Sequence, residues 1–170
     1  MIRQVALACI LAQALAGGDP LLRFFPTAAE IPGLKAVGDA RHCDGGEALT
    51  AIYDGGYQRY ANAGVTGASQ RFFQLAGGTV EVTLHQMKTE DAAARFLASL
   101  CDGIKASVEG RVFKKTSGRL CISAGRDSAY GYLAVGNLLA MASFDRGDLK
   151  AARAILEAIG KRTTGAHRAR

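Results

Sequence analysis

The sequence lacks the short motifs that mark the common nucleotide-binding and hydrolase sites. Although 21 of its 170 residues are glycine, it contains no G-x-x-x-x-G-K-[ST] segment, and no G-x-G-x-x-G follows an expected strand. It also contains no G-x-S-x-G segment, the motif of the nucleophile elbow. The glycines are therefore interpreted as turn residues, and the usual phosphate-binding loops and α/β-hydrolase sites are excluded.

Paired cysteine motifs are absent as well. None of the four cysteines forms a C-x-x-C pair, so a thioredoxin-like motif and a zinc ribbon both lack their basic element. Cys43 directly follows His42, but neighbours on a strand point to opposite faces and cannot act together as nucleophile and base. Cysteine catalysis is therefore not predicted.

No apolar run at the N-terminus is long enough to cross a bilayer. The run from Val5 to Ala16 has twelve residues, follows a basic start, and ends with small residues at Ala14 and Ala16. This pattern predicts a signal peptide over residues 1–16 and an exported chain, periplasmic or extracellular, with no transmembrane segment after cleavage. The alternatives are an N-terminal core helix, or a lipoprotein anchored at Cys9 if the true start lies upstream.

The positive charge is concentrated at the C-terminal end. Residues 161–170 hold four of the basic residues, and without them and Arg3 the chain has 16 basic and 15 acidic residues. Nucleic-acid binding normally needs a basic face on the folded body, so no nucleic-acid partner is predicted. We expect one domain over residues 17–160, followed by a basic disordered tail over 161–170.

Export would place the cysteines of the cleaved chain in an oxidising compartment, where one disulfide among Cys43, Cys101 and Cys121 is expected. We favour Cys101–Cys121, which closes a loop of about twenty residues. Pairing of Cys43 with either of the other two is the alternative.

The hydrophobic pattern predicts an α+β domain with an antiparallel sheet of about five to six strands, covered by two main amphipathic helices and several short ones. The main helices are expected over residues 89–110 and 148–160, with Gly110 ending the first, and short helical turns over 46–56 and 57–64. Strand candidates are residues 34–43, 70–77, 79–87, 111–115, 119–124, 130–135 and 138–144, with hairpin turns at Gly77-Gly78 and Gly136-Asn137. One candidate shows a clear apolar and a clear polar face, since Val80, Val82 and Leu84 alternate with Glu81, Thr83 and His85.

The segment Asp54-Gly55-Gly56 interrupts a helical stretch and has two interpretations. As a structural joint, the glycines let one helix end and another begin while the backbone closely approaches its neighbour, and Asp54 caps the second helix. As a recognition loop, it forms a ligand-binding site with Tyr57 and Tyr60. The tyrosines of this segment either pack a short helix onto the sheet or line a shallow groove for a sugar or peptide.

Candidate metal ligands are few. His42 and Asp44 lie close together in the sequence, with Glu47 and Asp54 following, and His85 lies on a later strand with Glu81. Three or four converging ligands are needed for a site, and none of these sets has a recognised spacing. His42, Asp44 and His85 are the predicted ligands if a metal binds, but no cofactor is predicted.

Two segments, "EALTAIYDGGYQRYANAGV" and "TVEVTLHQMKTEDAAARFLASL", resemble a family of uncharacterised secreted bacterial proteins with an Ile-Asn-Gly-Gly-Ala-Glu-like motif. The resemblance extends from Phe25 to Lys161. Asp54 stands where asparagine is usual in that family, and Gln58 where glutamate is usual. It implies an exported α+β domain of unknown function without an assigned activity or cofactor.

Two functions are consistent with these observations. The first is a non-enzymatic exported domain that binds an envelope protein or a small ligand. The second is a small extracytoplasmic metal-assisted hydrolase using His42, Asp44, Glu47, Asp54 or His85. The first is favoured because the sequence contains no recognisable catalytic constellation.

Overall fold

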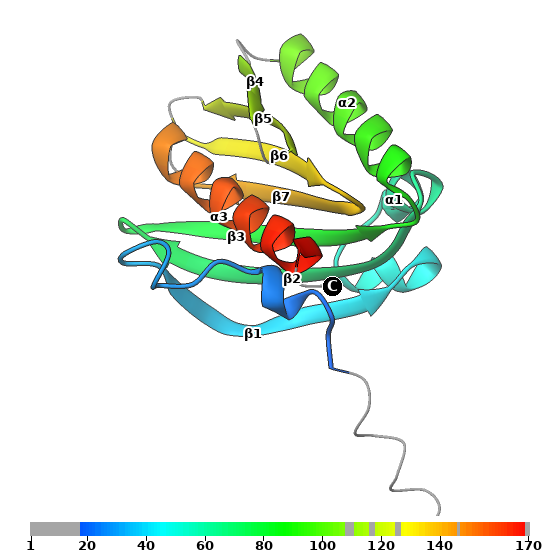
Figure 1. Cartoon of the computed structure of the whole chain (residues 1–170), viewed down its shortest axis with the longest axis horizontal. Coiled ribbons are helices and arrows are strands. Elements are labelled where there is room, and N and C mark those ends of the chain that lie inside the picture. Colours follow the sequence, from blue (N-terminus) through cyan, green and yellow to red (C-terminus); the bar gives the residue numbers. More distant parts are fainter. Residues whose placement is uncertain (1–17, 108–110, 116–117, 125–126, 146, 169–170) are drawn as a thin grey trace, which may run out of the picture.

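The structure, a computed structural model, describes residues 18–107, 111–115, 118–124, 127–145 and 147–168 (Figure 1). The predicted signal peptide, with Cys9, and the expected helix end at Gly110 lie outside the described residues. Three α-helices are described, α1 (Tyr57–Asn62), α2 (Glu90–Ser107) and α3 (Leu149–Arg168), with two 3₁₀ helices, η1 (Leu22–Phe24) and η2 (Gly46–Ala51). The strands are β1 (Lys35–Asp44), β2 (Val65–Leu75), β3 (Gly78–Met87), β4 (Arg111–Lys115), β5 (Gly118–Ala124), β6 (Ala129–Val135) and β7 (Leu138–Phe144).

The strands form one antiparallel sheet in the order β1-β2-β3-β7-β6-β5-β4. Two meanders, β1 to β3 and β4 to β7, therefore join where β7 pairs with β3, and α2 connects them. The predicted α+β class with an antiparallel sheet is confirmed. Within the described residues the sheet has seven strands instead of about five to six, because every strand candidate belongs to it. Helix α2 begins as expected, because the Thr89 hydroxyl accepts a hydrogen bond from the Ala92 amide at 3.0 Å.

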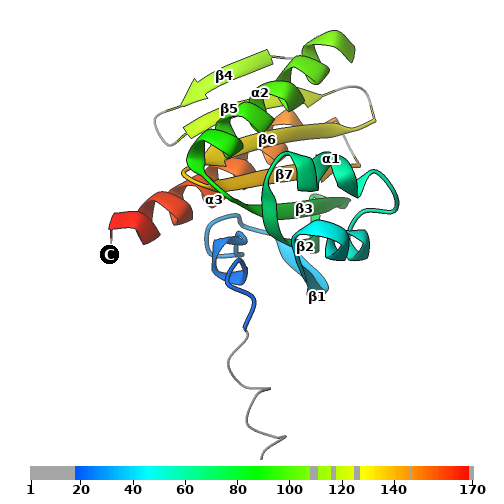
Figure 2. The same cartoon turned by 90° about the vertical axis from the view of Figure 1, so that its right-hand side faces the viewer.

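Helices cover both faces of the sheet. Figure 2 shows α1 and α2 on one side and α3 on the other. The register agrees: His42, Ser69, Leu84 and Ala140 are successive cross-strand neighbours on the α3 face, and Cys43, Ala68, His85 and Leu139 are neighbours on the α2 face. Each face has its own core of buried side chains. The two candidate histidines are thereby separated by the sheet.

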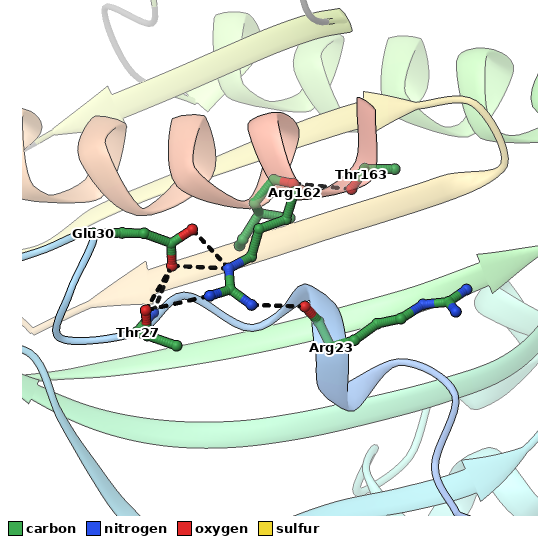
Figure 3. Close-up of polar contacts among 6 residues, drawn as sticks. Arg23, Thr27, Glu30, Arg162 and Thr163 are labelled. Carbon is green, nitrogen blue, oxygen red and sulfur yellow. Dashed lines mark hydrogen bonds and ion pairs between the residues drawn. The ribbon is translucent and has the colours of Figure 1, made fainter. Parts of the chain in front are cut away.

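The expected disordered tail is wrong for residues 161–168, because α3 continues to Arg168. Figure 3 shows the Arg162 guanidinium directed from α3 into the segment before β1. Its Nε donates to both carboxylate oxygens of Glu30, at 2.7 and 2.8 Å, and its Nη1 donates to the Arg23 carbonyl at 2.9 Å. Burial alone would raise the Glu30 pKa, but hydrogen bonds from Arg162 and Thr27 outweigh it and lower that pKa. The end of α3 therefore holds the lead-in segment, residues 18–34, through these polar contacts.

The first hairpin turn is displaced by one residue from the expected position. Leu75 pairs with Gly78, so the turn residues are Ala76 and Gly77, with φ angles of 52° and 77°. A two-residue hairpin favours positive φ at both central positions, and here the first of them is an alanine. Gly78 instead begins β3 and is buried.

Gly131 of β6 allows α3 to lie close to the sheet. A Cβ at this position would lie 2.8 Å from Leu156 Cδ1 and 2.9 Å from the Cys121 carbonyl oxygen. The leucine can rotate, but the carbonyl belongs to the neighbouring strand and can move only if the ladder between β5 and β6 is disturbed. We predict that Gly131→Ala lowers the free energy of unfolding by about 2 kcal/mol, measured by urea denaturation.

Gly165→Ala is the matched control, because a Cβ at Gly165 meets nothing within 4 Å and alanine favours the helix. It should leave stability unchanged or raise it. Equal stability of the two alanine variants would contradict the close packing of α3 on β6.

Candidate functional site

A cleft of about 440 Å³ opens on the α2 face of the sheet. Its floor is formed by the central strands β3, β6 and β7. Leu100 and Gly103 of α2 form one wall, and Tyr53 and Arg59, which flank the Asp54-Gly55-Gly56 segment, form the other. A volume of this size is typical of small-molecule sites.

The floor of the cleft is built from alternate residues of central strands. Glu81 and Thr83 of β3 face it, and their cross-strand neighbours Ser143 and Met141 of β7 lie beside them. The next strand contributes Tyr130 and Tyr132. The polar face predicted for β3 is therefore correct as a pattern, but it lies beneath α1 and α2, where Thr83 is 3% and His85 0% exposed.

Glu81 provides the acidic group of the cleft. Its Oε1 accepts a hydrogen bond from Gln70 Nε2 at 2.8 Å and a long one from the Thr83 hydroxyl at 3.5 Å. Gln70 is itself buried. Glu81 forms no ion pair with any residue that the structure describes.

Beside the cleft, three aromatic rings stack almost parallel. The ring centroids of Tyr53 and Tyr60 are 3.8 Å apart, and that of His85 lies 5.6 Å from Tyr60. Phe96 of α2 closes the group with its ring nearly perpendicular to Tyr60. The tyrosines thus pack a short helix onto the sheet, as the packing interpretation predicted, while Tyr53 also presents a surface to the cleft.

His85 has partners on both ring nitrogens. Nδ1 lies 3.1 Å from the Leu139 carbonyl oxygen and therefore donates to it, so Nε2 accepts the hydrogen bond from the Tyr53 hydroxyl. Burial lowers the pKa of His85 to about 4, although the Leu139 carbonyl opposes this shift. Burial, and then the neighbouring Tyr60 hydroxyl, raise the pKa of Tyr53. Both side chains are therefore neutral at physiological pH.

Asp54-Gly55-Gly56 is a joint between η2 and α1, but not in every predicted detail. Gly55 and Gly56 have φ angles of 82° and 69°, so each adopts a conformation that favours glycine. A Cβ at either glycine would meet nothing within 4 Å, so close backbone approach is not the reason. Gly56 is the N-cap of α1 and has no side-chain cap, so the predicted capping by Asp54 is wrong.

The segment predicted to bind ligand is next to the cleft and does not line it. Asp54, Gly55 and Gly56 are exposed, and Tyr57 and Tyr60 are half-buried against the α2-face core. From this part of the chain, Tyr53 and Arg59 line the cleft instead. Ligand binding by the five predicted residues stays a prediction, since none of them lines the cleft.

The predicted metal ligands do not converge. His85 lies on the α2 face with both nitrogens engaged, whereas His42 and Asp44 belong to the alternate positions of β1 that face the other way. No group of three or more histidine, cysteine, aspartate or glutamate side chains within the described ranges could hold a metal. The structure therefore does not bring His42, Asp44 and His85 together into one metal site.

His42 instead helps to fasten the lead-in segment. Ser69 Oγ lies 2.6 Å from Asp19 Oδ2, to which it donates, and 2.9 Å from His42 Nδ1, while Asp19 Oδ1 is 3.2 Å from that same nitrogen. In a catalytic triad the histidine bonds serine and aspartate through different nitrogens. Here serine and aspartate contact the same nitrogen and each other, so the histidine cannot relay a proton from one to the other.

The structure joins Cys101 of α2 to Cys121 of β5, with 5.8 Å between their Cα atoms, and leaves Cys43 as a buried free thiol. The favoured pairing is confirmed. Cys101 lies between the two wall residues Leu100 and Gly103, so the disulfide fixes that wall of the cleft to the sheet.

No family model and no curated protein matches the chain. A solved structure does match. The extracellular domain of PknH from Mycobacterium tuberculosis superimposes with a TM-score of 0.56 at 13% identity, over 81% of this chain and 89% of that one. At this identity the match shows a shared fold.

No helix in the described part of the chain is both long and apolar enough to cross a bilayer.

Sequence reasoning did not identify the cleft residues Glu81, Tyr130 and Tyr132 as a set. A signal was present, since each lies on a central strand in a period-2 pattern that places polar or aromatic side chains on one face.

Proposed function

We propose that this protein is an exported, non-enzymatic binding domain whose ligand occupies the cleft on the α2 face. The observation that carries the proposal is the cleft itself, a space of about 440 Å³ whose floor and walls combine three tyrosines with a carboxylate that has no ion-pair partner among the described residues. Apolar surfaces with a few convergent polar groups are typical of ligand sites.

Export is supported by three independent features. The N-terminus has the pattern of a signal peptide, the disulfide suits an oxidising compartment, and the fold resembles an extracellular domain. The resemblance to secreted proteins of unknown function agrees with them. A metal-assisted hydrolase is not favoured, because its proposed ligands lie on opposite faces of the sheet.

The experiment is a ligand screen on the disulfide-bonded protein, recovered from an exporting bacterial host. Ligand-observed NMR with amino acids, short peptides, amines and sugars should find binders to the wild type. Ser143→Trp is expected to abolish their binding, because Ser143 is an exposed residue of the cleft lining and the indole would fill the space. Loss of at least about tenfold in affinity is expected, which corresponds to about 1.4 kcal/mol.

The matched control is Ser99→Trp, the same substitution at an exposed α2 position that does not line the cleft. It should bind like the wild type. If the binders found are equally weakened by both tryptophan variants, or by neither, the cleft is not the site.

A further inference from the structure

The Glu81 carboxylate accepts hydrogen bonds from described residues through only one of its two oxygens. Gln70 is 6% and Thr83 3% exposed, and both donate to the same oxygen, Oε1. No described residue donates to Oε2. The buried amide therefore fixes the orientation of the carboxylate and leaves one oxygen for a ligand.

The charge of Glu81 is not balanced within the described residues. Among the lining residues that the structure describes, Arg59 is the single cationic side chain, and its guanidinium lies over the Phe96 ring, 5.8 Å from the ring centroid. It forms no ion pair with Glu81. A carboxylate partly removed from water without a counter-charge is unfavourable, and a cationic ligand would remove that cost.

The aromatic side chains favour the same kind of ligand. Tyr53, Tyr130 and Tyr132 line the cleft, and Tyr130 and Tyr132 lie 6.4 Å apart with their rings tilted by 59°. Burial raises the pKa of Tyr53 and Tyr132, so their rings carry no negative charge at neutral pH. Neutral aromatic faces attract organic cations, and a carboxylate beside them adds a direct ion pair.

We infer that the cleft selects ligands that carry a protonated amino group, which pairs with Glu81 Oε2 and contacts the faces of the lining tyrosines. This inference rests on the proposed function and specifies its ligand class. A neutral ligand of the same shape can fill the cleft but cannot balance the carboxylate.

The test uses two probes of equal size, 2-phenylethylamine and 2-phenylethanol, titrated at millimolar concentration against the ¹⁵N-labelled protein. The amine should bind about tenfold more tightly than the alcohol. In Glu81→Gln, which keeps the side-chain shape and an acceptor for Gln70, this preference should disappear while the alcohol binds as before. Glu90→Gln, an exposed glutamate at the start of α2, is the control for net charge and should keep the preference.

Equal binding of the two probes to the wild type would overturn the inference without any variant, and so would an amine preference that survives in Glu81→Gln or an amine that does not bind. The proposed function fails differently. If Ser143→Trp leaves the binding of both probes unchanged, the cleft is not their site, whatever the preference of the wild type.

Discussion

Removal of the disulfide by Cys101→Ala with Cys121→Ala should lower the free energy of unfolding by about 3 kcal/mol. The bridge closes a loop with a sequence separation of 20 residues. Closing such a loop lowers the entropy of the unfolded chain and thereby raises its free energy by about 3 kcal/mol. Urea denaturation of the oxidised wild type and the double variant measures the difference. The same variant should lose the amine binding described above, because Leu100 and Gly103 flank Cys101 in the wall of the cleft.

Cys43→Ala is the control, since it also removes a buried sulfur but leaves the bridge intact. We expect it to cost clearly less than the double variant and to keep the cleft. If Cys43→Ala and the double variant unfold at the same urea concentration, the disulfide contributes no more stability than the packing of a buried sulfur atom.

The elements of the fold could be predicted because their local patterns are strong. The apolar stripe of α2 and the alternation in β3 each specify one kind of element, and α2 carries one of the two disulfide cysteines on its stripe. The patterns do not specify long-range pairing. That β7 lies between β3 and β6 depends on how the two meanders meet, which no local signal encodes.

The end of α3 was missed for a different reason. Residues 161–168 contain polar and basic side chains, which taken alone suggest a solvated tail. At helical spacing after Ile159, however, Thr163 is buried and Ala166 packs against the core, while Arg162 reaches Glu30. Small and polar residues can thus continue the buried face of a helix. The sequence alone does not show that residues 161–168 do so, because this depends on where the lead-in segment lies.

The candidate site was predicted less well than the fold, because periodicity tells which residues share a face and not what covers that face. Glu81, Thr83 and His85 were expected on a wet face, and the structure places His85 under two tyrosine rings and the other two on the cleft floor. The glycine pair stands out in the sequence because glycine permits positive φ, which Gly55 and Gly56 adopt. The nearby cleft residues show no unusual local sequence pattern.

Acidification from neutral pH to about 4 should cost about 3 kcal/mol of stability through His85 alone. Its pKa is lowered from 6.5 to about 4 by complete burial, so between these values the unfolded state binds a proton that the native state does not. The contribution of neutral His85 to stability is therefore fully present above pH 6.5. It falls as the pH drops toward 4 and levels off below that value. Protonation would also remove the acceptor for the Tyr53 hydroxyl, which lies in the wall of the cleft.

The measurement is the free energy of unfolding of the wild type and His85→Phe at several pH values between 7 and 4. The variant should be less stable at pH 7, because the Leu139 carbonyl and the Tyr53 hydroxyl lose their partner. Its stability should nevertheless change about 3 kcal/mol less across the range, since phenylalanine does not titrate. If His85→Phe keeps the wild-type slope, the pH dependence of stability does not arise from His85.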